Sequence, residues 1–189
     1  MKFDEKRAKV ENQVIEYLTK RKFKEASLTV AAYEAEQTHP RGIGIDWKHY
    51  NPNHDIEMLK TIFESKPPKI IVRLGNEKLE TVRIAVAMME LWGENKAKKW
   101  LPVDFEMGLR FDNDTTVVRM FLFYAQHRTT LERYRSEGLE HVEILPAPDS
   151  CEACRRLAGK HYKLNEAPEL PNEHCTHKMG CRCTFLPVV

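Results

Sequence analysis

The first 150 residues of this chain contain no cysteine, and nowhere does the chain contain a long apolar run. Its longest apolar stretch consists of Val117 and Val118 followed by residues 120–125, which is far too short to span a bilayer. The N-terminal residues are charged and lack the apolar segment that a secretory signal needs. These absences predict a protein of a reducing, cytoplasmic setting with no membrane partner.

The chain also lacks a large excess of charge of either sign. Its formal net charge is +2, and residues 139–189 carry six lysines and arginines against seven aspartates and glutamates. Nonspecific binding to nucleic acid usually depends on a clustered basic face, so this balance argues against such a face at the C-terminal end. The phosphate-binding motif G-x4-G-K-S/T, the nucleophile motif G-x-S-x-G and the metalloprotease motif H-E-x2-H are all missing.

All five cysteines lie in the last 39 residues of the chain. Their number is odd, and their C-x2-C and C-x-C spacings suit thiolates that converge on a metal ion better than a disulfide staple. Zinc takes four thiolate or imidazole ligands in a tetrahedron, so only four of the candidates bind one ion. The sequence predicts a zinc site made by Cys151, Cys154, Cys175 and Cys181, with His177 and Cys183 as alternates.

Hydrophobic periodicity predicts a mainly helical α+β protein. We expect a helical region over residues 1–100 and a small α+β zinc-binding domain with short strands over residues 101–189. Strict alternation predicts a strand over residues 103–111, and β-branched residues predict short strands at 70–72 and 139–145. The expected helices are two before the break at residues 40–44, a third that Asn53 caps, a fourth that contains residues 82–89 and ends near Gly93 or Pro102, and a fifth from Asp112–Asp114 to about Glu137.

One enzymatic motif has a partial match here. His141-Val142-Glu143 followed by Cys151-x2-Cys154 resembles the arrangement of zinc deaminases, in which a histidine and two cysteines bind zinc and the glutamate transfers protons. In that chemistry the two motifs begin two helices that a strand separates, and the seven residues between Glu143 and Cys151 are too few for this. A zinc-dependent deaminase or hydrolase is therefore the least favoured of three hypotheses.

The order of features from about Thr115 onward resembles a known family. A long helix ends at Tyr134-Arg135-Ser136-Glu137-Gly138 and is followed by a strand, Cys151-x2-Cys154, Gly159-Lys160 with Tyr162, and a terminal Cys181-Arg182-Cys183. This order resembles the C-terminal zinc-binding domain of phage Mu F-like head-morphogenesis, or minor capsid, proteins. The resemblance implies that Cys151, Cys154 and the Cys181/Cys183 pair belong to a zinc site. It also implies a histidine ligand before the terminal pair, for which His177 is the candidate.

Two functions remain beside the enzymatic one. The leading hypothesis is a non-enzymatic, zinc-stabilised protein of this phage-head-related family that acts through contacts with a protein partner not identified by the sequence. The alternative is a zinc-containing nucleic-acid-binding module, for which Lys98, Lys99 and Trp100 offer basic side chains beside an aromatic ring.

Overall fold

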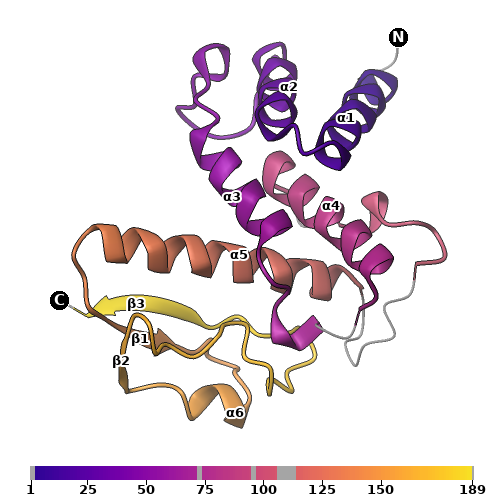
Figure 1. The fold of residues 1–189 in the computed structure, drawn as a ribbon. Helices are drawn as coiled ribbons and strands as arrows, with labels where there is room; N and C mark the ends of the chain where they lie inside the picture. Colours follow the sequence, from indigo (N-terminus) through magenta and orange to yellow (C-terminus); the bar gives the residue numbers. More distant parts are fainter. Residues whose placement is uncertain (1–2, 72–73, 95–96, 106–113, 189) are drawn as a thin grey trace.

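The computed structural model describes residues 3–71, 74–94, 97–105 and 114–188. It confirms a mainly helical α+β protein with a small antiparallel sheet at the C-terminal end (Figure 1). The elements follow one another in the order α1 (Phe3–Thr19), α2 (Phe23–Ala35), η1 (Trp47–His49), α3 (Asn53–Glu64), η2 (Lys69–Ile71), α4 (Asn76–Trp92), η3 (Ala97–Trp100), α5 (Asp114–Ser136), β1 (His141–Leu145), α6 (Glu152–Arg155), β2 (His161–Lys163) and β3 (Thr184–Val188).

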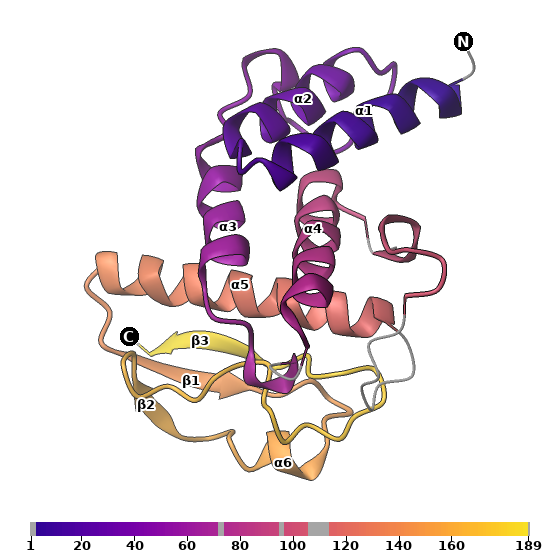
Figure 2. The same cartoon turned by 45° about the vertical axis from the view of Figure 1, so that its right-hand side comes forward.

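Helices α1 and α2 lie together at one end of the molecule, and α3 and α4 run from them to the long helix α5 (Figures 1 and 2). Two of the helices end at a glycine, as the sequence predicts. Gly93 adopts a left-handed φ of 58° after α4, and Gly138 a φ of 79° after α5. Glycine has no Cβ to clash in this conformation, so the chain can turn sharply there.

Helix α5 separates the other helices from the sheet (Figures 1 and 2). Its N-terminal half, including Val118 and Phe121, lies in a large apolar core with α1–α4. Near its C-terminal end, Leu131 and Tyr134 contact a second, smaller core that contains the sheet and four buried cysteines. One continuous helix therefore joins the two cores. No helix in the described ranges combines the length and the apolarity that a membrane crossing requires.

The sheet has the order β2-β1-β3, and both pairings are antiparallel. Val142 and Ile144 of β1 are buried, whereas His141 and Glu143, which alternate with them, are only half-buried. This alternation follows from the period-2 geometry of a strand with one face toward the core. The strand predicted over residues 139–145 is present as β1, which begins at His141 instead of at residue 139.

Other local predictions were wrong or fall outside the described ranges. Lys69–Ile71 forms a 3-10 turn and no strand, because the backbone N–H of Ile71 donates locally to the carbonyl of Pro68 at 2.9 Å; residue 72 of the strand predicted over 70–72 is not among the described ones. Residues 103 and 104 lie in a turn, and residues 106–111 of the strand predicted there are not among the described ones. Pro52 stands at the cap position of α3, and the side chain of Asn51 accepts the backbone N–H of Asn53 at 3.0 Å.

The part of the chain after α5, which contains the sheet and the cysteines, is called the module below. The segment between α3 and α4 touches it (Figure 2). The backbone N–H of Lys69 donates to Glu169 Oε1 at 2.7 Å, and its side-chain Nζ lies 3.2 Å from Glu173 Oε1. Ile70 contacts both apolar cores. A second connection joins α5 to the module, where Arg119 donates to the carbonyl of Met179 at 2.7 Å.

Candidate metal centre

Two cysteines lie at the start of the short helix α6. Cys151 is its N-cap residue, and its carbonyl accepts the N–H groups of Cys154 at 3.1 Å and Arg155 at 3.0 Å. One turn of helix brings the side chains at these two positions onto the same side of the chain. The C-x2-C spacing therefore brings the two thiols together through local backbone geometry, as the sequence predicts.

The other three cysteines come from the segment between β2 and β3. Cys175 follows a turn in which its N–H donates to the carbonyl of Asn172 at 2.9 Å. Gly180 makes a second turn, with its N–H donating to the carbonyl of His177 at 2.9 Å and a left-handed φ of 76°. These two turns return the chain to α6 before it enters β3.

The sulfur atoms lie close enough together to hold a metal ion. Cys151 Sγ is 3.9 Å from Cys175 Sγ, and Cys154 Sγ is 3.8 Å from Cys181 Sγ. Four thiolates bound tetrahedrally at about 2.3 Å from an ion are separated by about 3.8 Å. Both sulfur–sulfur distances match this expected separation along an edge of the tetrahedron.

Cys154 occupies the middle of the cluster. Its Sγ lies within 4.8 Å of the sulfurs of Cys151 and Cys175 in one group, and of Cys181 and Cys183 in another. Each group alone offers three ligands to an ion. The four predicted ligands and the alternate Cys183 thus lie in one cluster, but the predicted four do not form a single group, because Cys181 is grouped with Cys154 and Cys183.

All five thiols are free of disulfide bonds, and all but Cys151 are buried. Hydrogen bonding with the Cys154 thiol lowers the pKa values of Cys175 and Cys183, whereas contacts with the neighbouring cysteines raise the pKa of Cys154 above its ordinary value. The thiols of the cluster must lose their protons to bind a metal ion as thiolates. A metal ion would replace these protons, so its binding would be coupled to proton release.

Three polar groups outside the sequence-predicted set contact the sulfurs. The backbone N–H of Thr176 donates to Cys151 Sγ at 3.4 Å, and Asn172 Nδ2 lies 3.7 Å from Cys154 Sγ. Ser150 Oγ is 3.9 Å from Cys183 Sγ. Such outer contacts orient metal-binding thiolates and stabilise their charge. Sequence reasoning missed Asn172 and Ser150 because neither spacing nor residue type marks them.

His177 lies beside the cluster but is directed toward other partners. Its Nε2 is 3.3 Å from Asp149 Oδ2, and its Nδ1 accepts the backbone N–H of Met179 at 3.1 Å. Arg182 also pairs with Asp149, and its guanidinium holds the pKa of that carboxyl below the usual value. Both ring nitrogens of His177 are therefore engaged by non-sulfur groups, and neither cysteine group includes this histidine.

The deaminase-like residues are not assembled with the cysteines. His141 and Glu143 share the face of β1 opposite to that of Val142 and Ile144. Val142 and Ile144 belong to the same apolar core as the buried cysteines. A water activated at the cysteine cluster would therefore have β1 between it and the carboxylate of Glu143.

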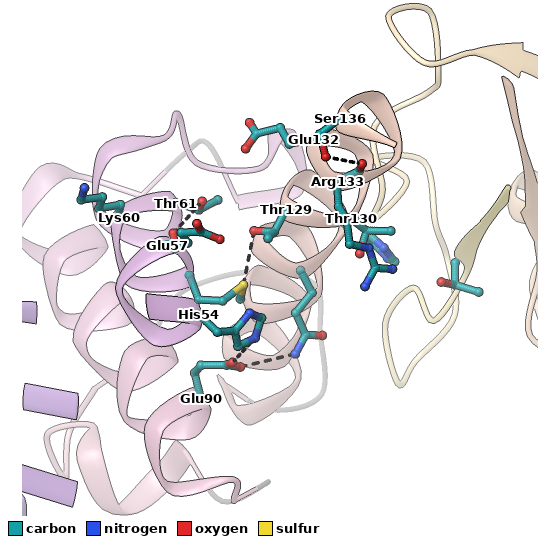
Figure 3. Close-up of a pocket in the computed structure, with 14 residues that line it drawn as sticks. His54, Glu57, Lys60, Thr61, Glu90, Thr129, Thr130, Glu132, Arg133 and Ser136 are labelled. Atoms are coloured by element: carbon teal, nitrogen blue, oxygen red, sulfur yellow. Dashed lines mark hydrogen bonds and ion pairs between the residues drawn. The ribbon is translucent and has the colours of Figure 1, made fainter. Parts of the chain in front are cut away.

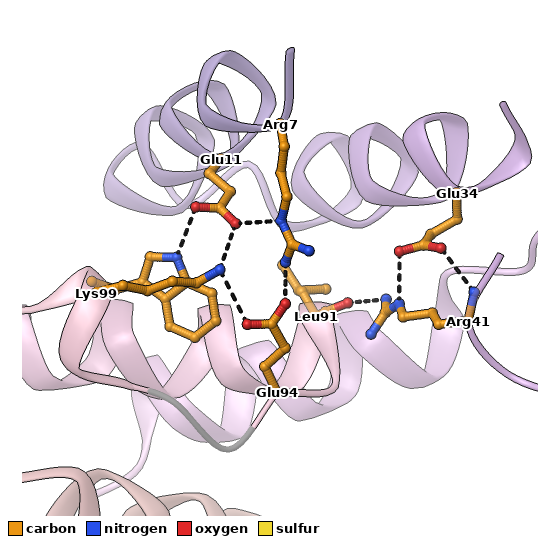
Figure 4. A network of polar contacts seen from close by, with 8 residues as sticks. Arg7, Glu11, Glu34, Arg41, Leu91, Glu94 and Lys99 are labelled. Atoms are coloured by element: carbon orange, nitrogen blue, oxygen red, sulfur yellow. Dashed lines mark hydrogen bonds and ion pairs between the residues drawn. The ribbon is translucent and has the colours of Figure 1, made fainter. Parts of the chain in front are cut away.

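Of the residues predicted to bind nucleic acid, Lys99 and Trp100 are engaged within the protein (Figure 4). Lys99 Nζ lies 2.8 Å from Glu11 Oε1 and 3.1 Å from Glu94 Oε2, and it covers the Trp100 ring at 4.5 Å. Trp100 is buried, and its Nε1 donates to Glu11 at 3.4 Å. Of the three predicted residues, Lys98 alone has no partner among the described residues. Lys99 and Trp100 thus join η3 to α1 and leave no aromatic surface for a base.

A separate cavity of about 820 Å³ lies between α3, α5 and the start of β3 (Figure 3). Glu90 borders it, with His54 Nε2 at 4.0 Å from one carboxylate oxygen and Gln126 Nε2 at 3.4 Å from the other. Burial raises the pKa of Glu90 and lowers that of His127, which also lines the cavity. No sequence motif indicated this cavity, because its walls come from elements far apart in the chain.

The chain was compared with protein-family models, with curated proteins and with solved structures, and none of the three comparisons found a match.

Proposed function

We propose that this chain is a non-enzymatic, zinc-stabilised protein of the phage Mu F-like head-morphogenesis type that acts through contacts with another protein. The observation that carries the proposal is the cysteine centre in the small module. Two of its sulfur–sulfur separations match the edge of a thiolate tetrahedron, and the hollow among the cysteines has no room for a water molecule. A zinc ion held by four of the five thiolates would stabilise the fold and have no open position for substrate.

Zinc is the metal that this ligand set favours. Soft thiolates in a tetrahedral arrangement select zinc or iron–sulfur centres over hard cations such as Mg²⁺ and Ca²⁺, which prefer oxygen ligands. The module around the site has only a small apolar core, and in model peptides a structural zinc ion contributes on the order of 10 kcal/mol. The ion would therefore fix the positions of the loops that contain residues 149–183.

Contacts with a protein partner agree with the surface of the molecule better than binding of nucleic acid does. The pairing of Lys99 with Glu11 and Glu94 engages one of the two lysines that the nucleic-acid hypothesis required. A second basic segment, Lys20-Arg21-Lys22, follows α1, and its Arg21 pairs with Glu80 at 2.5 Å. The resemblance to head-morphogenesis proteins supports the same conclusion, because those proteins act within protein assemblies.

Elemental analysis of the purified protein tests the metal part of the proposal. We expect one zinc ion per chain in the native protein and none in Cys154→Ser. Absence of metal, or iron with visible absorbance, would contradict it.

Affinity purification from the native host, with the native chain and with Cys154→Ser as parallel baits, tests the partner. A protein enriched by the native chain and lost with Cys154→Ser is the expected result, whereas zinc-dependent turnover that Glu143→Ala abolishes would favour the enzymatic hypothesis instead.

A further inference from the structure

A second cavity, of about 800 Å³, lies where the helices meet the cysteine module. Its walls come from the end of α3, from the segment that leads to η2, from the middle of α5 and from the module. The charged residues that border it are Lys60, Glu64, Lys66, Lys69, Arg128 and Glu169, and we call this site the junction groove. Figure 2 shows how the end of α3 and the following turn reach the module at this point.

Positive charge predominates in the junction groove and is poorly neutralised. Among the described residues, Lys60, Lys66 and Arg128 have no carboxylate partner, and all three side chains are exposed. Arg128 instead contacts the hydroxyl of Tyr124, whose oxygen lies 3.4 Å from its Nη1. Three uncompensated cations around one hollow raise the local potential for an anionic ligand, because the low-dielectric walls focus their field.

The shape and the charges of the groove favour an acidic polypeptide over a nucleic acid. Tyr124 is buried, and Arg128 lies over its ring at 5.8 Å, so no exposed aromatic face is available for stacking a base. Glu64 and Glu169 also border the groove. They would repel a continuous phosphate backbone, whereas an acidic peptide with an occasional lysine or arginine can satisfy both signs of charge.

Two contacts of Lys69, a residue in the wall of the junction groove, link the groove to the loop that leads to the cysteine centre. Glu169, which accepts the backbone N–H of Lys69 at 2.7 Å, lies in the segment between β2 and Cys175. Lys69 Nζ is held by Glu173 at 3.2 Å, two residues before Cys175. The path of residues 65–69 along the groove thus depends on a loop whose far end is a candidate metal ligand.

We infer that the junction groove binds an acidic segment of a protein partner, and that a metal ion in the cysteine centre keeps the groove in its binding conformation. This inference rests on the proposed function, since it names the chemistry of the protein contact. Lys60, Lys66 and Arg128 supply the attraction, while the Lys69–Glu169 contact fixes the wall.

A short fluorescein-labelled peptide of glutamates interrupted by single lysines is the probe, and fluorescence anisotropy at low salt measures its binding to the full-length, metal-loaded chain. The double variant Lys60→Glu/Arg128→Glu should weaken binding by at least about tenfold, the change expected when two attractive charges become repulsive. The matched control Lys24→Glu/Lys48→Glu changes the net charge equally on exposed lysines outside the groove, and it should weaken binding by no more than about twofold. Removal of the metal by a chelator should reproduce the loss seen in the groove variant.

Three outcomes would overturn the inference. In the first, the peptide does not bind the chain. In the second, both double variants weaken peptide binding equally. In the third, an oligothymidylate binds the groove and the peptide does not. The thermal midpoints of all variants, measured first, show that the exposed substitutions leave the fold intact. If the native partner still requires the metal but ignores Lys60→Glu/Arg128→Glu, the proposed function stands and the junction groove is not its site.

Discussion

Gly180 of the cysteine loop packs directly against Met120 of α5. A Cβ atom added at Gly180 would lie 2.7 Å from Met120 Sδ and 3.0 Å from a methyl carbon of Thr116. Since α5 is the helix shared by both apolar cores, this contact fixes the position of the cysteine loop relative to the rest of the protein. The relationship gives the first of four predictions.

Gly180→Ala should destabilise the protein by about 2–4 kcal/mol, because it adds a clash with α5 to the strain of a left-handed φ of 76°. The matched control is Gly138→Ala, which has a φ of 79° and no heavy atom within 4 Å of the added Cβ. The control should lose only the stability that comes from the backbone conformation, about 1 kcal/mol of the free energy of unfolding. Urea unfolding measures both, and equal losses would show that the contact with Met120 contributes nothing.

The second prediction concerns the metal ligands. Cys154→Ser should abolish stoichiometric metal, because its sulfur belongs to both cysteine groups and a hydroxyl replaces a soft anionic ligand. Cys175→Ser and Cys181→Ser should weaken binding far more than His177→Ala or Cys183→Ser. Competition with a chromophoric chelator gives the affinities. The reverse ranking would mean that the histidine implied by the family resemblance is a ligand here.

Removal of the metal should loosen more than the cysteine segment. Leu131 and Tyr134 of α5, and Ile70 before α4, pack against the core that contains the cysteines. We therefore expect faster amide exchange after chelation in residues 146–183, in the last turns of α5 and in residues 65–71. Helices α1 and α2 contribute nothing to that core among the described residues, so their exchange should stay unchanged. Uniform acceleration over the whole chain would indicate one cooperative unit instead.

The fourth prediction uses the buried carboxylate of Glu90. Burial raises its pKa above the ordinary value, so the charged form is less favourable in the folded than in the unfolded state. This destabilising effect is present at neutral pH and disappears as the pH falls below the unfolded-state pKa, where the group is protonated in both states. Glu90→Gln should therefore raise the thermal midpoint at pH 7 and change it little at pH 3. The control Glu57→Gln replaces an exposed carboxylate at the same cavity. It should leave the thermal midpoint unchanged at both pH values.

Much of the secondary structure could be predicted from local pattern. The helices of the N-terminal region, the long helix that ends at Gly138 and the strand β1 all follow from hydrophobic periodicity and helix-capping residues. The prediction failed at Ile70 and Ile71, where β-branched residues suggested a strand. Two prolines before them and a close contact with the module impose a turn there, which intrinsic propensity does not register.

The sequence by itself determined which residues could hold a metal and that Cys151 and Cys154 act together, because one helical turn fixes the relation between residues three apart. It could not determine how the other thiols are arranged. Their sulfur positions depend on the turns at Asn172 and Gly180 and on packing against Met120, all of which are long-range or backbone effects.

Only the tertiary structure decided the roles of the charged residues. Lys99 appeared available for nucleic acid in the sequence, but Glu11 and Glu94 surround it once α1 and α4 come together. His177 appeared to be a ligand candidate, but its Nε2 faces Asp149. The physical reason is the same in both cases: the energy of a charge or a lone pair depends on what lies within a few ångströms, and the fold brings those partners from distant parts of the chain.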